Sequence, residues 1–253
     1  MAFIKKNQDA VVPQVSENNV EHAPQKLVDE QFKHIAFIMD GNGRGATKRG
    51  MPREYGHKEG VLAFKKVGIY CCDIGFEAVT VYAFSTENWK RPKREVNAIM
   101  KLLDDYLEEL KRDHLLYRNR FRFIGDLSVL TPELQAKIKE VEKLNADKRA
   151  VLNVALNYGG RAELVHAFNE LAKQGKTDIT EADIADAVYT ADCGDPDMIV
   201  RTGGDFRISN FLLWQAAYAE LYFTDVLWPD FSIEHVNEAI RVFYSRKRRF
   251  GGV

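Results

Sequence analysis

Hydrophobic positions follow two different spacings along most of the chain. From Lys33 onward, short runs of β-branched and aromatic residues alternate with longer stretches of helical period. This alternation predicts a mostly parallel sheet flanked by helices, in a single α/β domain. The predicted strands cover residues 34–39, 78–84, 121–124, 151–156, 198–200 and 221–223. The predicted helices cover residues 60–73, 95–112, 131–145, 161–173, 210–219 and 233–248.

The first part of the chain differs from the rest in composition. It is rich in Asn, Gln, Glu and Val and lacks the apolar centre of a secretion signal, so residues 1–32 are predicted to be a mobile leader and residues 33–253 the folded domain. No run elsewhere approaches the ~20 apolar residues of a membrane span. Three cysteines, two of them adjacent at Cys71 and Cys72, do not suit a disulfide framework. A reducing, cytoplasmic location is expected.

The overall charge excludes one class of partner. Lysine and arginine number 36 against 37 acidic residues, which gives a net charge of −1. No global field therefore attracts nucleic acid, and we expect no nucleic-acid partner. Any anion site must be built locally.

Polar segments follow the predicted strands. In open α/β sheets, ligands bind at the carboxyl ends of the strands. The segments there are glycine-rich or polar, and three of them carry an arginine: residues 40–44, 85–89, 125–126, 157–161 and 201–205. Their concentration on one edge of the sheet predicts one site.

Residues 40–44 (Asp-Gly-Asn-Gly-Arg) have the components of a phosphate cradle. The glycines let backbone N–H groups approach an anion, the arginine supplies a planar donor, and the carboxylate can hold Mg²⁺. A tight turn explains the same residues. A dinucleotide fingerprint formed by Gly41, Gly43 and Ala46 fits less well, because the next predicted strand ends about twice as far along as the ribose-binding acid requires.

Residues 201–209 combine two arginines and two hydroxyls around a glycine pair, just before the predicted helix 210–219. The N-terminus of that helix would favour an anion, and a diphosphate suits such a site. Surface ion pairs on a turn are the alternative. The acids of residues 104–108 lie opposite an apolar stripe and are interpreted as a solvated helix face. Residues 85–91 form either a closing lid or an exposed connector.

Taken in order along the chain, the motifs resemble those of a known family. The segments are 34–44 (HIAFIMDGNGR), 82–89 (YAFSTENW), 156–161 (LNYGGR), 199–204 (IVRTGG), 208–215 (ISNFLLWQ) and 220–223 (ELYF). They are similar to successive signatures of the undecaprenyl diphosphate synthases, which are cis-prenyltransferases. The resemblance extends over nearly all of residues 33–252, and the ordered set is far more specific than any one glycine motif.

The resemblance implies roles for individual residues in joining an allylic to a homoallylic diphosphate. Asp40 and Glu220 would bind Mg²⁺, and Asn88 would assist proton removal from isopentenyl diphosphate. Farnesyl diphosphate would lie against Gly41, Asn42, Gly43, Arg44, Gly45, Arg53 and His57. Ser85, Thr86, Glu87, Trp89 and Arg91 would share a mobile loop with Asn88. Arg201, Arg207, Ile208 and Ser209 would hold isopentenyl diphosphate.

The resemblance also implies a product and partners. The product would be undecaprenyl diphosphate, a lipid carrier precursor for cell-wall glycans. The predicted helices 60–73 and 95–112 offer apolar side chains for a channel around the growing chain. The protein would be a homodimer in which the R-x-G motif at residues 249–251, with Gly251, reaches the partner's site. A lipid product also predicts transient contact with a membrane surface.

Gly45 departs from the family pattern, which has tryptophan there. We expect the aromatic wall of the allylic site to be missing and the loop beside Arg44 to be less stiff. The alternative is that Gly45 adopts a positive φ angle. Two other functions stay open, a non-catalytic accessory subunit and a nicotinamide-dependent oxidoreductase. The first should have lost Asp40 or the R-x-G motif, and the second needs the missing ribose-binding acid.

Overall fold

Six strands form a parallel sheet at the centre of the molecule. The computed structural model describes residues 26–113 and 119–246. The strand order is β3-β4-β2-β1-β5-β6, and all neighbours pair in parallel. The strands are β1 (His34–Ile38), β2 (Ala78–Ser85), β3 (Asn119–Ile124), β4 (Ala150–Tyr158), β5 (Met198–Arg201) and β6 (Glu220–Phe223). The six predicted strands are confirmed, because short apolar runs are what a sheet covered on both faces requires.

The helices of the described residues are α1 (Asn42–Lys48), α2 (Arg53–Asp73), α3 (Lys93–Arg112), α4 (Pro132–Leu144), α5 (Gly160–Lys173), α6 (Glu181–Ala187) and α7 (Ile233–Ser245). The sequence predicted five of them, although α2 begins seven residues before the predicted start. It missed α1 and α6, which have seven residues each and are too short for a clear helical period. The end of the helix predicted over 233–248 lies outside the described residues.

The helix predicted over residues 210–219 is wrong. Only a short 3₁₀ turn, Gln215–Tyr218, forms there. Ser209, Asn210 and Leu212 have φ angles of 49°, 62° and 46°, a left-handed conformation that a right-handed helix cannot contain. Phe211 and Leu212 are fully buried against the sheet. The apolar residues of 210–219 are therefore explained by the burial of an irregular segment, not by a helix.

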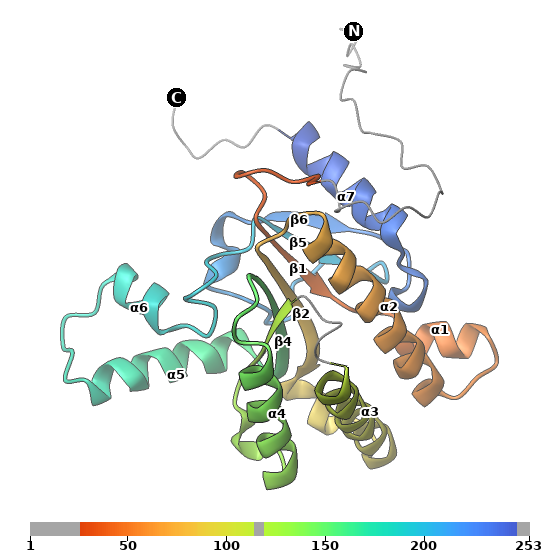
Figure 1. Ribbon diagram of the computed structural model, residues 1–253, viewed down its shortest axis with the longest axis horizontal. Coiled ribbons are helices and arrows are strands. Elements are labelled where there is room, and N and C mark those ends of the chain that lie inside the picture. The colour runs from red at the N-terminus through yellow and green to blue at the C-terminus, as the bar shows by residue number, and fades with distance from the viewer. Residues whose placement is uncertain (1–25, 114–118, 247–253) are drawn as a thin grey trace, which may run out of the picture.

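The two faces of the sheet are covered differently, as Figure 1 shows. Helices α2, α3, α4 and α7 cover one face and build the main core with the strands. On α3, Leu103 and Leu107 are buried, while Asp104 and Glu108 pair with Lys137 at the surface, which confirms the predicted solvated face. The irregular segment before β6 packs on the other face, and α5 with α6 forms a smaller cluster of its own.

Residues 26–32, assigned above to the leader, pack on the domain instead. Val28 and Phe32 are buried in the main core, and the Phe32 ring stacks on Phe243 of α7 with 3.9 Å between centroids. The backbone N–H of Leu27 donates to the carbonyl of Ile74 at 2.8 Å. The folded part therefore begins earlier than residue 33. Residues 1–25 lie outside the described part of the chain.

The topology of the sheet marks one edge as the place for a site. The chain leaves β1 toward β2 on one side and leaves β5 toward β6 on the other, so β1 and β5 are neighbours at which the strand order reverses. Ligands of open α/β sheets bind at such a switch point, outside the carboxyl ends of the strands. Ile38 pairs with Arg201 at this end, which places Arg201 next to the segment that follows β1. Among the described residues, no helix has the length and apolar character needed to cross a membrane.

Candidate active site

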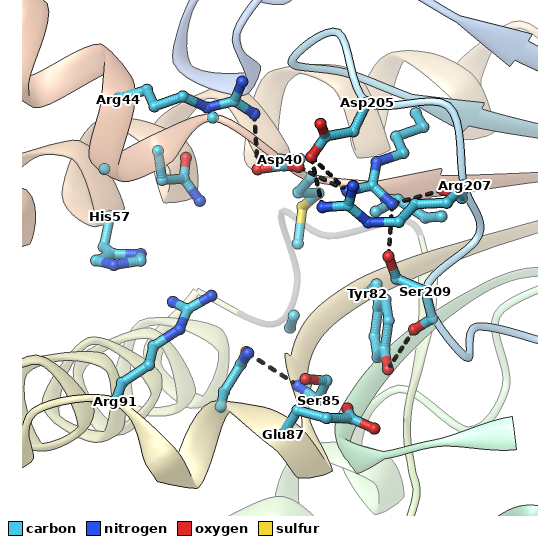
Figure 2. Close-up of a pocket in the computed structure, with 18 of the residues that line it drawn as sticks. Asp40, Arg44, His57, Tyr82, Ser85, Glu87, Arg91, Asp205, Arg207 and Ser209 are labelled. Carbon is cyan, nitrogen blue, oxygen red and sulfur yellow. Dashed lines mark hydrogen bonds and ion pairs between the residues drawn. The ribbon is translucent and has the colours of Figure 1, made fainter. Parts of the chain in front are cut away.

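A cleft of about 750 Å³ opens at the carboxyl ends of β1, β2 and β5. Figure 2 shows His57 and Arg91 on one side of it and Arg207 and Ser209 on the other. Most predicted site residues line this cleft: Asp40, Gly41, Asn42, Gly43, Arg44, Arg53, His57, Ser85, Glu87, Asn88, Arg91, Arg201, Arg207 and Ser209. Three of the five strand-end segments, 40–44, 85–89 and 201–205, therefore meet at this cleft. The prediction of one site is wrong for segments 125–126 and 157–161, which line a separate cavity.

The segment after β1 is fixed by its backbone. The carbonyl of Asp40 accepts hydrogen bonds from the Trp228 N–H at 2.9 Å and the Thr202 hydroxyl at 2.7 Å. Gly41 has a φ of 109°, and a Cβ there would lie 2.8 Å from Leu227. Only glycine therefore allows this close turn into α1.

Asp40 lies between two arginines. Its carboxylate accepts from Arg201 Nη2 at 2.8 Å, and it forms an ion pair with Arg44 Nη2 at 3.1 Å. Burial opposes ionisation, but the hydrogen bonds from Arg201 and Arg44 outweigh it and lower the pKa of the Asp40 carboxyl. Asp40 is thus an ionised oxygen donor whose side chain is 30% exposed to the cleft.

Helices α1 and α2 form one wall of the cleft, which we call the helical wall. Arg53 and His57 lie in the first two turns of α2, and both donate to Glu95 of α3 at 3.0 Å. Arg91, at the end of the loop after β2, donates to the same carboxylate at 3.1 Å. A Cβ at Gly43 would lie 2.6 Å from the Arg53 guanidinium carbon, so glycine there leaves the space that the guanidinium occupies.

Glu95 was not predicted as a site residue. It lies in helical register with Ile99 and Leu102 of the apolar stripe, and an acid in such a stripe was the available signal. Burial opposes its ionisation, yet hydrogen bonds from Arg53 and His57 lower the pKa of the Glu95 carboxyl. Burial lowers the pKa of His57, despite the opposing effect of Glu95. The fold thus gives His57 an acidic partner that the sequence pattern did not identify.

Residues 201–209 form the opposite wall, which we call the loop wall. Arg201 is 4% exposed and donates through Nη1 to the Ser209 hydroxyl at 2.6 Å and the Arg207 carbonyl at 2.5 Å. Asp205 accepts from Arg201 at 3.1 Å and from Arg207 at 2.7 Å. Because no α-helix follows this segment, the predicted contribution of a helix dipole is wrong. Polarity comes from side chains held by an irregular backbone.

The loop after β2 closes the cleft between the two walls. The Asn88 side-chain oxygen accepts from the Ser85 N–H at 3.1 Å. This contact caps the 3₁₀ turn Thr86–Lys90 and fixes the Asn88 side chain in its middle. Asn210 donates to the Glu87 carboxylate at 3.2 Å and so joins this loop to the loop wall. Asn210 was not predicted, since its role depends on a left-handed backbone that the sequence pattern hid.

Thr86, Trp89 and Ile208 of the predicted site do not line the cleft. Thr86 lines a separate cavity of about 400 Å³. The Trp89 indole N–H donates to Asn157 at 2.8 Å, and its ring packs edge-on against Phe84. Ile208 packs against the apolar cluster under the irregular segment.

Gly45 is buried and faces away from the cleft. A Cβ there would lie 3.3 Å from Pro229 and 3.3 Å from the Arg49 guanidinium. Gly45 lies within α1 and is absent from the glycines with positive φ. The suggested positive φ is therefore wrong. A side chain at this position would also point away from the cleft, toward Pro229 and Arg49. It would therefore not form the expected aromatic wall of the allylic site.

Glu220 lies at the opposite end of the sheet from Asp40. It opens β6 and pairs in register with Met198, which is level with Ile35 of β1. Asp40 follows five residues after Ile35, or roughly 16 Å along the strand direction. The Glu220 carboxylate instead accepts from Arg246 at 2.7 Å. The two carboxylates of one chain therefore cannot share an ion. Gly251 and the R-x-G motif lie outside the described residues.

A second cavity of about 100 Å³ continues from the cleft between α2 and α3. Both cavities are lined by Met39, Asn42, His57 and Ala83. Beyond these shared residues, its lining is almost entirely apolar: Val61, Phe64, Val81, Ile99, Met100, Leu102, Leu103, Tyr106, Val154, Leu156 and Trp228. The predicted apolar channel between these helices thus has a start at the cleft.

Comparison with known proteins points to one family. The sequence profile of the undecaprenyl diphosphate synthases, a prenyltransferase family, matches residues 38–251. An isoprenyl transferase of Fusobacterium nucleatum is 49% identical over 223 residues, covering 87% of this chain and 96% of its own. A farnesyl-diphosphate-specific ditrans,polycis-undecaprenyl-diphosphate synthase of Vibrio vulnificus is 47% identical over 229 residues, covering 87% and 90%. The crystal structure of lavandulyl diphosphate synthase from Lavandula x intermedia, in complex with dimethylallyl diphosphate, has a TM-score of 0.84 and 33% identity and covers 88% of this chain and 100% of that one.

Proposed function

The chain belongs to the undecaprenyl diphosphate synthase family, and from this premise we propose that it condenses isopentenyl diphosphate with farnesyl diphosphate in cis geometry to make undecaprenyl diphosphate. The observation that carries the proposal is a cleft with a cationic wall on each side of Asp40 and an apolar cavity leading away from it. Two anionic head groups and one growing apolar chain need this combination.

The helical wall suits the allylic diphosphate. Arg44 donates to the Gly203 carbonyl and Arg53 donates to Glu95. Their side chains are nevertheless 48% and 55% exposed, so their remaining N–H groups are available to a ligand. The apolar cavity begins beside His57 on the same wall, which supports placing the farnesyl chain there. In the reaction, the allylic carbon–oxygen bond breaks and its electron pair leaves with the diphosphate. Arginines that already face this position stabilise the developing charge without rearranging.

The loop wall suits isopentenyl diphosphate. Arg207 is 63% exposed, and the Ser209 hydroxyl lies next to it in the cleft. The terminal methylene carbon of the isopentenyl unit forms the new bond to the allylic carbon, and a proton leaves that unit. Asn88 lies between the walls, where its amide would orient the isopentenyl unit while the proton passes to a diphosphate oxygen or to water.

Asp40 fits a magnesium site. It is ionised, partly exposed to the cleft and close to where both diphosphates are proposed to lie. Mg²⁺ commonly takes one or two carboxylates and completes its shell with phosphate oxygens and water. When bound, the ion would neutralise charge on the leaving diphosphate. Glu220 of the same chain lies too far away to join Asp40.

The proposal extends to a cytoplasmic homodimer. Arg246 pairs with Glu220 at the amino end of β6, so the described chain stops far from its own cleft. Arg249 follows three residues later, a span of at most about 10 Å. This position supports a second copy as the recipient of the R-x-G motif. Light scattering of the purified protein tests the dimer. We also propose transient contact with a membrane when the lipid product leaves, which vesicle co-sedimentation in the presence of product tests.

The accessory-subunit alternative is disfavoured by an intact cleft that keeps Asp40, both cationic walls and the channel entrance. The decisive experiment incubates the purified protein with farnesyl diphosphate and labelled isopentenyl diphosphate, with and without Mg²⁺, and sizes the lipid product. We expect a C55 diphosphate that forms only with the ion. Absence of elongation by a folded protein with Mg²⁺ present would reject the proposed activity.

A further inference from the structure

Glu95 is a buried acid that holds three cationic or polar donors at the cleft. Its side chain is 6% exposed. Oε2 accepts from Arg53 Nε at 3.0 Å, and Oε1 accepts from His57 Nε2 at 3.0 Å and from Arg91 Nη1 at 3.1 Å. A buried charge is costly unless it is paired and hydrogen-bonded, and this carboxylate meets that condition with three separate partners.

The three partners belong to elements that surround the allylic side of the cleft. Arg53 and His57 come from α2, Arg91 comes from the end of the loop after β2, and Glu95 comes from the first turn of α3. Figure 2 shows His57 and Arg91 pointing into the same open space. One carboxylate thus connects both helices that flank the apolar cavity to the loop that carries Asn88.

We propose that Glu95 is a positioning residue, which fixes Arg53, His57 and Arg91 in the orientation that receives the allylic diphosphate. This inference rests on the proposed function. Two guanidinium groups facing one cleft repel each other, and each has a long, flexible side chain. A shared buried carboxylate offsets the repulsion and selects one arrangement before the ligand arrives, so less ordering is needed on binding.

The direction in which diphosphate affinity changes when Glu95 is neutralised distinguishes a positioning role from a purely electrostatic one. Glu95 is negative and lies behind the site of an anion, so neutralising it should strengthen diphosphate binding if only through-space charge mattered. If Glu95 positions the cations, the same change should weaken binding, because the donors lose their common anchor. Glu95→Gln preserves shape and removes the charge, which makes it the discriminating variant.

The matched control is Glu109→Gln. Glu109 also joins α3 to α2, through an ion pair with Lys65. Lys65 does not line the cleft, whereas the three partners of Glu95 do. Both variants therefore remove one interhelical carboxylate from the same pair of helices. Thermal unfolding of each variant reports any general loss of structure.

The experiment measures the dissociation constant of farnesyl thiodiphosphate, an unreactive analogue, by titration calorimetry with Mg²⁺ present. We expect Glu95→Gln to weaken binding about tenfold, and Glu109→Gln to stay within about twofold of the wild type. In a double-mutant cycle, Arg53→Ala combined with Glu95→Gln should cost much less than the sum of the single changes, because Glu95 acts through Arg53. Unchanged or tighter binding by Glu95→Gln, or full additivity, would overturn the proposal.

Two further results have a defined meaning for the proposed role of Glu95. If Glu95→Gln does not fold, Glu95→Asp keeps the charge but shortens its reach, and we expect binding about threefold weaker; wild-type affinity of that variant would reject the proposal. A wild-type chain that binds the analogue but makes no lipid would reject only the proposed function. A wild-type chain that does not bind the analogue would reject the positioning role as well.

Discussion

The two walls of the cleft use similar residues in opposite ways. On the helical wall, Arg44 and Arg53 are about half exposed, and a buried carboxylate anchors Arg53 from behind. On the loop wall, the central cation Arg201 is 4% exposed and is already paired with Asp40 and Asp205. Both walls pair arginines with carboxylates, but the loop wall buries its central cation, whereas both arginines of the helical wall keep about half of their side chains exposed. A count of arginines alone would miss this difference.

The two walls also differ in how their backbones are built. The helical wall depends on the close packing of α1 on α2, whereas the loop wall depends on left-handed residues such as Ser209 and Asn210. Asp40 lies between them and contacts a cation from each. We therefore expect the largest effect from a change at Asp40. A change between α1 and α2 should have a smaller effect, and a change on the side of α1 that faces away from the cleft should have the smallest.

The largest effect is expected from Asp40→Ala, which removes the contact shared by both walls. Turnover should fall more than about 100-fold, because the proposed magnesium ligand is lost. The fold should persist, since the side chain is partly exposed and Arg201 keeps Asp205 as a partner. Steady-state kinetics and thermal unfolding check both statements. Near-normal activity that still depends on Mg²⁺ would remove Asp40 from the mechanism.

A smaller effect is expected from Gly56→Ala in the helical wall. A Cβ at Gly56 would lie 1.9 Å from the Asn42 carbonyl oxygen, so α1 must move away from α2. Overpacking of this kind costs about 1–3 kcal/mol, and urea denaturation should show it as a lower free energy of unfolding. Gly175→Ala measures backbone strain alone, because Gly175 has a φ of 77° but no atom within 4 Å of the added Cβ. Gly56 lies within α2 and has no positive φ, so alanine would favour folding there if no clash occurred. An unchanged or higher free energy of unfolding in Gly56→Ala would contradict the predicted clash.

The sequence predicted the chemistry of the walls better than their shape. The motif at Asp40 and the arginines at 201 and 207 follow strands, and strand ends meet at one edge of a parallel sheet, so their convergence was predictable. The pairing of His57 with Glu95 was not predictable, because these residues lie on different helices and are 38 positions apart in the sequence. The left-handed backbone conformation of Leu212 was also not predictable from the sequence. A buried irregular segment and a buried helix give similar apolar runs.

The smallest effect is expected from Gly45→Trp, which tests the edge of the helical wall. A side chain at this position points toward Pro229 and Arg49 rather than into the cleft. Replacing glycine within a helix favours folding by up to about 1 kcal/mol, and Gly45→Ala isolates that part of the effect. We expect the KM for farnesyl diphosphate to stay within about twofold of the wild type. A KM at least fivefold lower for the tryptophan variant alone would restore the idea of a missing aromatic wall.

The central claim, that each wall takes a different diphosphate, is tested most directly by a crossed comparison of Arg53→Ala and Arg207→Ala. The two side chains are 55% and 63% exposed, so their loss should disturb packing to a similar extent. Each substitution removes charge-assisted contacts worth about 1.5–3 kcal/mol. We predict that Arg53→Ala raises the KM for farnesyl diphosphate roughly tenfold and leaves that for isopentenyl diphosphate within about twofold, and that Arg207→Ala does the reverse. Equal increases for both substrates in both variants would contradict the division of the cleft into two walls with separate ligands.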